Sequence, residues 1–329
     1  MDNVRPLGGD VYEIDTRMAG YSGITAGYLI LGDRPCLVET GTSTSAPTVI
    51  EALASLGVGP QDLATIVVTH IHLDHAGGVG DLARHYPNAE VVVHEKGARH
   101  LADPSRLMAS ARMVWGDKLD VLFGDLAPTE AARIRSLGDT GSIDLGNGRR
   151  LDSHYSPGHA KHHVGLIDSE TGDLYVGDAA GVYLPETGDL RPATPPPDFD
   201  LDTALNSLKL FGALGPQRLL FSHYGPAEDV TAKLNEGADT VVGEAYVMAR
   251  SEDAIKVIEE GGPDNSLGLI EAYLNIDPFS DEATDSIPGL RRLVRDNAEG
   301  VALVGGEVAE AYDTRQAIHR DTWLIVPIT

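Results

Sequence analysis

The stretch VVTHIHLDHAGGVG, residues 67–80, places three histidines and one aspartate within six positions, from His70 to His75. The apolar residues at its start predict a buried strand that ends just before the cluster. In an extended or turning segment, His70 and His72 point the same way because side chains alternate with a period of two. That pair could hold one metal ion, and Asp74 with His75, in the next turn, could hold a second.

These four side chains offer the donor atoms that transition metals prefer. Imidazole nitrogens and a carboxylate suit zinc, and they also suit iron or manganese. The pair Gly77-Gly78 would let the backbone turn tightly into a helix whose N-terminus faces the cluster. Four donors exceed what one tetrahedral zinc with an open position needs, yet they do not complete two coordination shells. The sequence therefore predicts further ligands elsewhere in the chain.

Three polar residues follow other strand-like runs within a residue or two. They are His159 in YSPGHAKHH, Asp178 in LYVGDA and His223 in LLFSHYG. Because sites in α/β sheets assemble at the carboxyl ends of strands, we expect these residues to complete the cluster. His162 is an alternative to His159. Otherwise we expect His162 and His163 to support a ligand or to lie at the surface.

Short strands and helices alternate along the first part of the chain, which predicts an α/β layered domain over residues 1–228. Residues 103–138 interrupt this rhythm and are interpreted as a helical insert, which is a lid, part of the core or a dimer face. The stretch 191–200, RPATPPPDFD, is too rich in proline for regular structure. Residues 229–329 are predicted to form a mainly helical C-terminal extension.

The motif THIHLDHAGG, followed in order by SPGHA, VGDA and SHYGP, resembles the H-x-H-x-D-H signature and later single-ligand motifs of the metallo-β-lactamase superfamily. The resemblance covers roughly residues 10–227. It implies an αββα sandwich of the α/β class, with the metal site at one edge between two sheets and the helical extension appended. By position, it implies that one ion is held by His70, His72 and His159, that a second is held by Asp74, His75 and His223, and that Asp178 bridges them.

Within the superfamily, the motif favours the two-metal hydrolases of the glyoxalase-II-like or lactonase-like branch. The flavodiiron branch resembles H-x-E-x-D-H, whereas this chain has His72 in place of the Glu. True β-lactamases of this fold usually lack the second-site Asp or place Cys there, and Cys36 is remote from every motif. Glu39 departs from the superfamily pattern, which usually has Asp at that position, where the carboxylate supports a metal ligand.

Two divalent ions can bridge a hydroxide and lower its pKa towards neutrality. The expected reaction is hydrolysis of an ester, thioester or lactone of a small molecule, with Asp74 orienting the nucleophile. Tyr183 and Tyr224 lie close in sequence to Asp178 and His223, so either could donate a hydrogen bond to the developing oxyanion. The alternative role for both tyrosines is packing.

Charge bears on the partners. Fifty acidic residues against twenty-five basic ones give a net charge of −25, which disfavours nucleic acid as a partner. A phosphodiesterase or nuclease of the same fold is thus the second interpretation. A non-catalytic metal-binding protein is a remote third, because such a protein would usually have lost a ligand. The acidity also suggests a source that lives at high salt, although a merely acidic enzyme fits as well.

The remaining composition points to a cytoplasmic protein. No apolar run approaches the roughly 18 residues that a membrane span requires, and the N-terminus lacks the pattern of a signal peptide. The single cysteine, Cys36, excludes an intrachain disulfide and fits a reducing compartment. We therefore expect a small-molecule substrate, no membrane partner and, if the insert is a dimer face, a homo-oligomer.

Overall fold

The computed structural model describes residues 2–195, 198–250, 259–261 and 268–270. The chain divides into two compact units, Met1–Ala245 and Tyr246–Thr329. The first unit contains every residue that the sequence predicted for the site, so the description centres on it. The predicted division at residue 228 falls just before helix α8, which begins at Val230.

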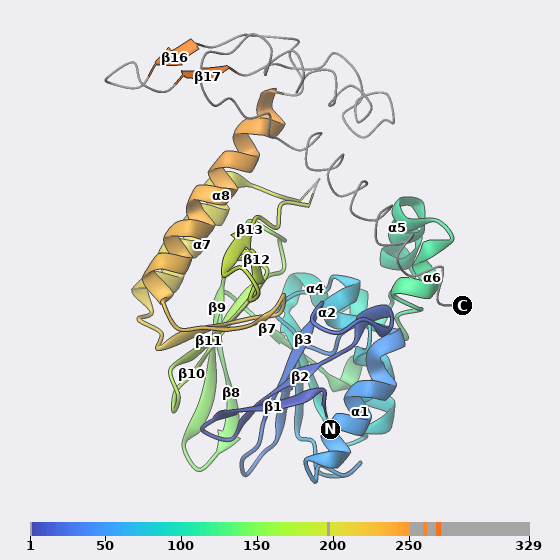
Figure 1. Cartoon of the computed structure of the whole chain (residues 1–329). Coiled ribbons are helices and arrows are strands. Elements are labelled where there is room, and N and C mark those ends of the chain that lie inside the picture. Colours follow the sequence, from blue (N-terminus) through green and yellow to red (C-terminus); the bar gives the residue numbers. More distant parts are fainter. Residues whose placement is uncertain (1, 196–197, 251–258, 262–267, 271–329) are drawn as a thin grey trace, which may run out of the picture. The chain divides into compact units, whose positions relative to one another are not determined.

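Two mixed β-sheets form the centre of the first unit (Figure 1). The first sheet has seven strands in chain order: β1 (Val4–Gly8), β2 (Val11–Asp15), β3 (Ala26–Ile30), β4 (Cys36–Val38), β5 (Thr65–Val67), β6 (Glu90–His94) and β7 (Ile134–Leu137). The second has six, in the order β15 (Gly225–Ala227), β14 (Arg218–Phe221), β11 (Asp173–Gly177), β10 (Val164–Asp168), β9 (Arg149–Tyr155) and β8 (Thr140–Gly146). A separate hairpin pairs β12 (Val182–Leu184) with β13 (Asp189–Arg191).

Helices cover the outer face of each sheet. Beside the first sheet lie α1 (Ala46–Ser55), α2 (Leu73–Ala76), α3 (Val79–His85), α4 (Glu95–Ala102), α5 (Ser105–Trp115) and α6 (Lys118–Leu122), with the short 3₁₀ turns η1 (Met18–Gly20), η2 (Ser43–Ser45) and η3 (Ala131–Arg133). Beside the second lie α7 (Leu201–Ala213) and α8 (Val230–Arg250), which run next to each other in Figure 1. The predicted αββα sandwich is confirmed.

The four layers of the sandwich form because the central strands are apolar on both faces. In β14, Leu220 joins the core between the two sheets, while Leu219 and Phe221 join the core beneath α7. This alternation is what a period of two imposes on a strand buried on both sides. Between the sheets, the Tyr28 hydroxyl donates to the carbonyl of Phe221 at 2.5 Å, and its ring meets the edge of Tyr175.

Two arginines, the buried Arg149 and the partly buried Arg218, tie the second sheet to the β1–β2 hairpin of the first. The side chains of Arg149 and Asp168 are 7% and 0% exposed and form an ion pair. Nη1 of Arg149 also donates to the carbonyl of Gly9 at 2.9 Å. In the same way, Arg218 pairs with Asp173 and reaches a backbone carbonyl of β1. These contacts fix the relation between the sheets whose loops build the site.

The insert is only partly helical. Residues 105–122 form α5 and α6 as expected, but the helix predicted after residue 126 is wrong, because the chain there forms η3 and then the edge strand β7. Pairing with β6 overrides the helical propensity of this segment. Phe123 packs in the core, whereas Met113 and Val121 are 82% and 71% exposed.

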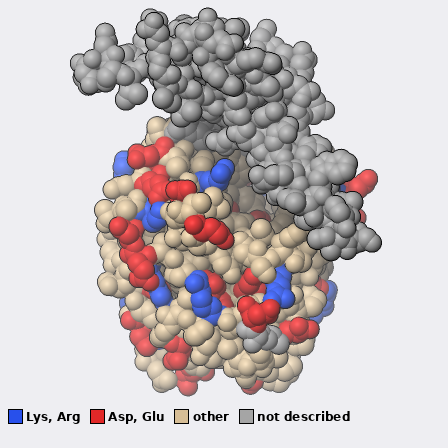
Figure 2. Space-filling view, in the orientation of Figure 1, with Lys and Arg blue, Asp and Glu red and all other residues tan. Residues whose placement is uncertain are grey.

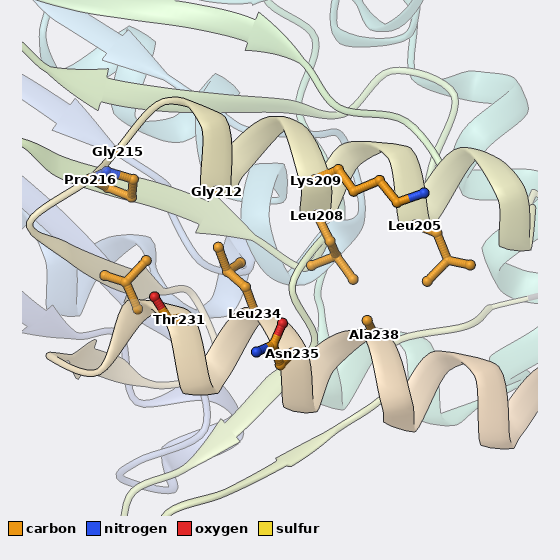
Figure 3. A pocket seen from close by; sticks show the side chains of 11 residues that line it. Leu205, Leu208, Lys209, Gly212, Gly215, Pro216, Thr231, Leu234, Asn235 and Ala238 are labelled. Carbon is orange, nitrogen blue, oxygen red and sulfur yellow. The ribbon is translucent and has the colours of Figure 1, made fainter.

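An apolar groove of about 430 Å³ runs between α7 and α8. In Figure 3, Leu205 and Leu208 of α7 face Leu234 and Ala238 of α8 across it. None of its lining residues belongs to the predicted metal cluster. The groove therefore lies apart from the predicted metal cluster.

The first helix predicted for the extension is present as α8, but most of this helix, up to Ala245, belongs to the first compact unit. Residues 259–261 and 268–270 instead form two antiparallel strands, β16 (Glu259–Gly261) and β17 (Gly268–Ile270), so the helices predicted at those positions are wrong. The other helical predictions for this extension, over 251–258, 262–267 and 271–329, lie outside the described residues. Among the residues described, none of the helices has the length and apolar character to cross a bilayer.

Candidate metal centre

The predicted ligands meet where loops from the two sheets come together. His70 and His72 lie in the segment between β5 and α2, and Asp74 and His75 lie within α2. The second sheet contributes the remaining three from segments that follow β9, β11 and β14: His159, Asp178 and His223. All seven side chains fall into overlapping groups whose potential ligand atoms lie within 4.8 Å of one another. The reasoning from strand ends thus placed them correctly in space.

The first group has the dimensions of a tripod for one ion. Nε2 of His70 lies 3.0 Å from Nδ1 of His72 and 3.3 Å from Nε2 of His159, and those last two atoms are 3.0 Å apart. Three nitrogens bound to one tetrahedral zinc at about 2.0–2.1 Å would be about 3.3 Å apart. The observed triangle therefore fits around a single cation.

The protonation of this group suits metal binding. Nδ1 of His159 donates to the carbonyl of Ala193 at 2.8 Å, so the Nε2 lone pair of the neutral ring points to the centre. The pKa of His72 is lowered to about 4, mainly by burial and further by the neighbouring His159. Burial also lowers the pKa values of His70 and His159. Three neutral imidazoles whose lone pairs converge repel one another unless a cation lies between them.

The second group consists of Asp74, His75 and His223. Oδ2 of Asp74 lies 3.1 Å from Nε2 of His223 and 3.6 Å from Nε2 of His75. Nδ1 of His223 donates to the carbonyl of Ile24 at 2.8 Å, which turns Nε2 towards the other two side chains. Burial alone would raise the pKa of Asp74, but His75 and His223 hold it below its usual range.

Asp178 lies between the two groups and divides its carboxylate between them. Oδ2 is 3.6 Å from Nε2 of His159 and 4.0 Å from Nε2 of His70. Oδ1 is 3.4 Å from Nε2 of His75 and 3.9 Å from Nε2 of His223. One oxygen therefore faces each group, which is the geometry of a bridging ligand.

The buried polar atoms of the second group test whether a metal fits. Both ring nitrogens of His75, Oδ1 of Asp178 and Oε2 of Glu39 have no hydrogen-bond partner. Leaving such groups unsatisfied costs about 1–3 kcal/mol each. Burial would lower the pKa of His75, but Asp178 and Asp74 raise it well above its ordinary value, which reports a surplus of negative charge. A divalent cation between Nε2 of His75 and Oδ1 of Asp178 would satisfy these two atoms and balance the charge, so the residues fit a metal.

Glu39 supports this group from behind, in the position expected from the sequence. Its Oε1 accepts a hydrogen bond from the backbone N–H of Thr69 at 3.0 Å, and its Oε2 lies 3.6 Å from Nδ1 of His75. The residue is 1% exposed and has a φ of 65°, a conformation that favours glycine. The carboxylate therefore lies behind a candidate ligand and belongs to none of the groups that could hold a metal.

His162 and His163 contact the candidate ligands from outside the cluster. Nδ1 of the buried His163 pairs with Ser156 Oγ at 2.9 Å, and its Nε2 accepts from the backbone N–H of Asp178 at 3.2 Å. His162 stacks on His70 with ring centroids 6.2 Å apart and belongs to none of the groups that could hold a metal. His159, and not His162, thus completes the first group.

The two tyrosines have contacts that favour the packing alternative. The ring of Tyr183 packs against Phe221 at 5.4 Å between centroids and lies under the ammonium of Lys233. Burial is the main cause that raises the pKa of Tyr224, and the neighbouring Glu13 carboxylate raises it further. Sequence reasoning instead missed the carbonyls of Ala193 and Ile24, because backbone groups that orient a histidine leave no residue-type signal.

The fold and the site define a class. The sequence profile of the metallo-beta-lactamase superfamily matches residues 21–223, which is more than half of the chain. This protein therefore belongs to the metallo-β-lactamase superfamily, as its motifs indicated.

Relatives with this fold carry several names. The metallo-beta-lactamase fold-containing protein ST1585 of Sulfurisphaera tokodaii is 33% identical over 163 residues, which cover 49% of this chain and 60% of that protein. The atrochrysone carboxyl ACP thioesterase of Aspergillus chevalieri is 28% identical over 243 residues, or 70% of this chain and 64% of that protein. The alignments thus span less than two thirds of either relative.

Solved structures agree with the fold. The crystal structure of ST1585 from Sulfolobus tokodaii superposes with a TM-score of 0.59 at 26% identity, covering 78% of this chain and 92% of that one. That of the metallo-beta-lactamase family protein TTHA1429 from Thermus thermophilus gives a TM-score of 0.56 at 26% identity, with 75% and 82% covered.

Proposed function

We propose that this protein is a dinuclear metal-dependent hydrolase that cleaves an ester, thioester or lactone bond of a small molecule. The observation that carries the proposal is the division of the Asp178 carboxylate, with one oxygen facing each three-residue group. Zinc is the proposed ion, and the same imidazole and carboxylate donors suit iron or manganese. When bound, two divalent ions supply Lewis acidity that activates water and polarises the scissile bond.

The chain's own residues supply orientation and proton transfer. The Asp74 side chain is 23% exposed, whereas those of Asp178 and His75 are 8% and 1% exposed. Asp74 is therefore the carboxylate of the cluster that a substrate can best approach. We propose that it orients the attacking water, accepts its proton and passes that proton to the leaving group.

Two observations favour carbonyl chemistry in a small molecule. One relative is named a thioesterase, which supports the thioesterase-like or lactonase-like branch. The net charge of −25 opposes the approach of a polyanion, and Figure 2 shows acidic side chains spread across the displayed face with Lys and Arg between them. A nuclease of this fold is accordingly the weaker alternative, and the cytoplasmic location stays a prediction.

The test joins metal analysis to a hydrolysis panel. Purified protein loaded with zinc should contain two ions per chain and hydrolyse a thioester or lactone but not bis(p-nitrophenyl) phosphate. Asp74→Asn should reduce kcat by at least about 100-fold, because proton transfer of this kind contributes about 10²–10⁴. The matched control is Asp239→Asn, an exposed aspartate of α8. One ion per chain, or full turnover by Asp74→Asn, would overturn the proposal.

A further inference from the structure

A cavity of about 400 Å³ adjoins the candidate metal centre. Its lining includes Ile71, Lys96, Arg99, Lys161, His162 and Asp198. None of the residues in the groups that could hold a metal is among the lining residues, so the cavity lies beside the candidate metal centre and is not the metal site itself.

The cavity wall is built partly from the metal-binding segment itself. Ile71 lies between His70 and His72 in the sequence, and its side chain packs against the first turn of α4. A Cβ at Gly97 would lie 2.9 Å from Cγ2 of Ile71, so glycine allows this close approach. On the other side, the His162 ring lies 5.9 Å from that of His72 between centroids. One small molecule could therefore reach from the cavity to the group formed by His70, His72 and His159.

The charge of the cavity is opposite to that of the chain. Lys96 and Arg99 have no carboxylate partner among the described residues, whereas cations such as Arg149, Arg218 and Lys233 are paired. Lys96 donates to the Tyr155 hydroxyl at 2.6 Å, and Arg99 donates to His100 at 3.1 Å. Both are surface side chains that retain further donors.

The one acidic residue of the lining does not cancel this charge. Asp198 pairs with Lys161 at 2.7 Å, which leaves the charges of Lys96 and Arg99 uncompensated. A protein with a net charge of −25 repels anions overall, but two uncompensated cations in one cavity attract an anion locally. An arginine fork and an ammonium group together are the donors that carboxylates and phosphates prefer.

We propose that this cavity is an anion subsite, in which Lys96 and Arg99 bind a carboxylate or phosphate of the substrate while the scissile bond lies at the metal centre. The substrate class is therefore an anionic ester or thioester. This inference rests on the proposed hydrolase function and deepens it. The anionic group lies on the acyl part or on the leaving group, and these two sources are separated by experiment.

The first experiment compares three thioesters with the zinc-loaded protein. S-acetyl-N-acetylcysteamine is neutral, S-succinyl-N-acetylcysteamine adds a carboxylate to the acyl part, and S-acetyl-4′-phosphopantetheine adds a phosphate to the thiol. We expect one of the anionic thioesters to exceed the neutral one in kcat/KM by about tenfold, chiefly through KM. The preferred compound identifies which part carries the anion. Equal kcat/KM for all three would overturn the subsite while leaving the hydrolase proposal intact.

Substitutions locate the preference within the cavity. Lys96→Gln and Arg99→Gln should each reduce the ratio of anionic to neutral kcat/KM several-fold, and raised salt should reduce the wild-type ratio. Lys209→Gln is the matched control, because Lys209 is an exposed lysine of α7 that also has no carboxylate partner among the described residues. A preference that survives in the Lys96→Gln/Arg99→Gln protein, or that Lys209→Gln also abolishes, would contradict the assignment.

A binding measurement tests the subsite even if no thioester is hydrolysed. Titration calorimetry of the zinc-loaded protein with inorganic phosphate and with succinate should show at least one of them binding about tenfold more weakly to Lys96→Gln/Arg99→Gln than to wild type. Any anion bound only by the ions would be held equally by both proteins. Identical affinities for both probes would overturn the subsite independently of catalysis.

Discussion

Oε2 of Glu39 lies 3.6 Å from Nδ1 of His75, so a buried carboxylate stands directly behind one of the candidate ligands. The other oxygen of Glu39 accepts from the backbone N–H of Thr69, at the start of the segment that carries the cluster. A carboxylate in this position fixes the ring of a metal-bound histidine and increases its basicity. Glu39 thus couples the end of a core strand to the second metal group.

Glu39→Gln should weaken metal binding at the second group. The amide oxygen can still accept from Thr69, but the negative charge beside His75 is lost, and such changes typically cost about 10–100-fold in metal affinity. Competition with a chromogenic chelator would measure this for each ion. Glu51→Gln, an exposed glutamate of α1, is the control. Unchanged affinity in Glu39→Gln would mean that the carboxylate has only a structural role.

His159 and His162 should differ in their effect on metal content. We expect His159→Ala to lose the ion of the first group, because its Nε2 closes the triangle with His70 and His72. His162→Ala should retain both ions, since its ring contacts those of His70 and His72 but belongs to none of the groups that could hold a metal. Elemental analysis of the two purified variants decides between them. Loss of an ion from His162→Ala would make that residue a ligand.

Arg149→Ala should destabilise the protein strongly. The substitution leaves Asp168 buried without its partner, and breaking a buried ion pair in this way costs about 3–5 kcal/mol of unfolding free energy. Replacing both residues, with Arg149→Met and Asp168→Leu, should recover part of the loss. Urea unfolding would measure each value. The exposed pair of Arg112 and Asp120 is the control, and an Arg149→Ala effect no larger than that of Arg112→Ala would contradict the argument.

The net charge of −25 should make stability depend on salt. The Debye length falls from about 10 Å at 0.1 M salt to about 3 Å at 1 M, so self-repulsion between surface carboxylates is screened. We expect the midpoint of thermal unfolding to rise steadily with KCl into the molar range. Sucrose at matched osmolality separates screening from solute exclusion. Equal stability at low and molar KCl would leave the protein acidic but not adapted to salt.

Much of the site was accessible from the sequence because its signals are local. The spacing from His70 to His75 and the positions of His159, Asp178 and His223 after apolar strands depend only on nearby residues. The direction of a side chain depends on tertiary packing instead. For that reason Tyr183, although five positions after Asp178, packs against Phe221.

The fold shows the same division. The sheets and most helices follow from runs of apolar residues, but β7 does not. Its segment is rich in residues that favour helices, and it becomes a strand because β6 offers an unpaired edge. Just before it, the Arg133 guanidinium donates to three backbone carbonyls at the end of α3 and beyond, which holds the segment in place. Such long-range contacts have no signature in a window of sequence.

The candidate ligands come from both sheets, with His70 to His75 following β5 of the first and His159, Asp178 and His223 following strands of the second. Ions held there would act as a clasp across the sandwich. The two halves could not separate without releasing them, so the lifetime of the folded chain would become linked to the rate at which metal leaves. Removal of the metal would then speed unfolding as well as abolish any metal-dependent activity.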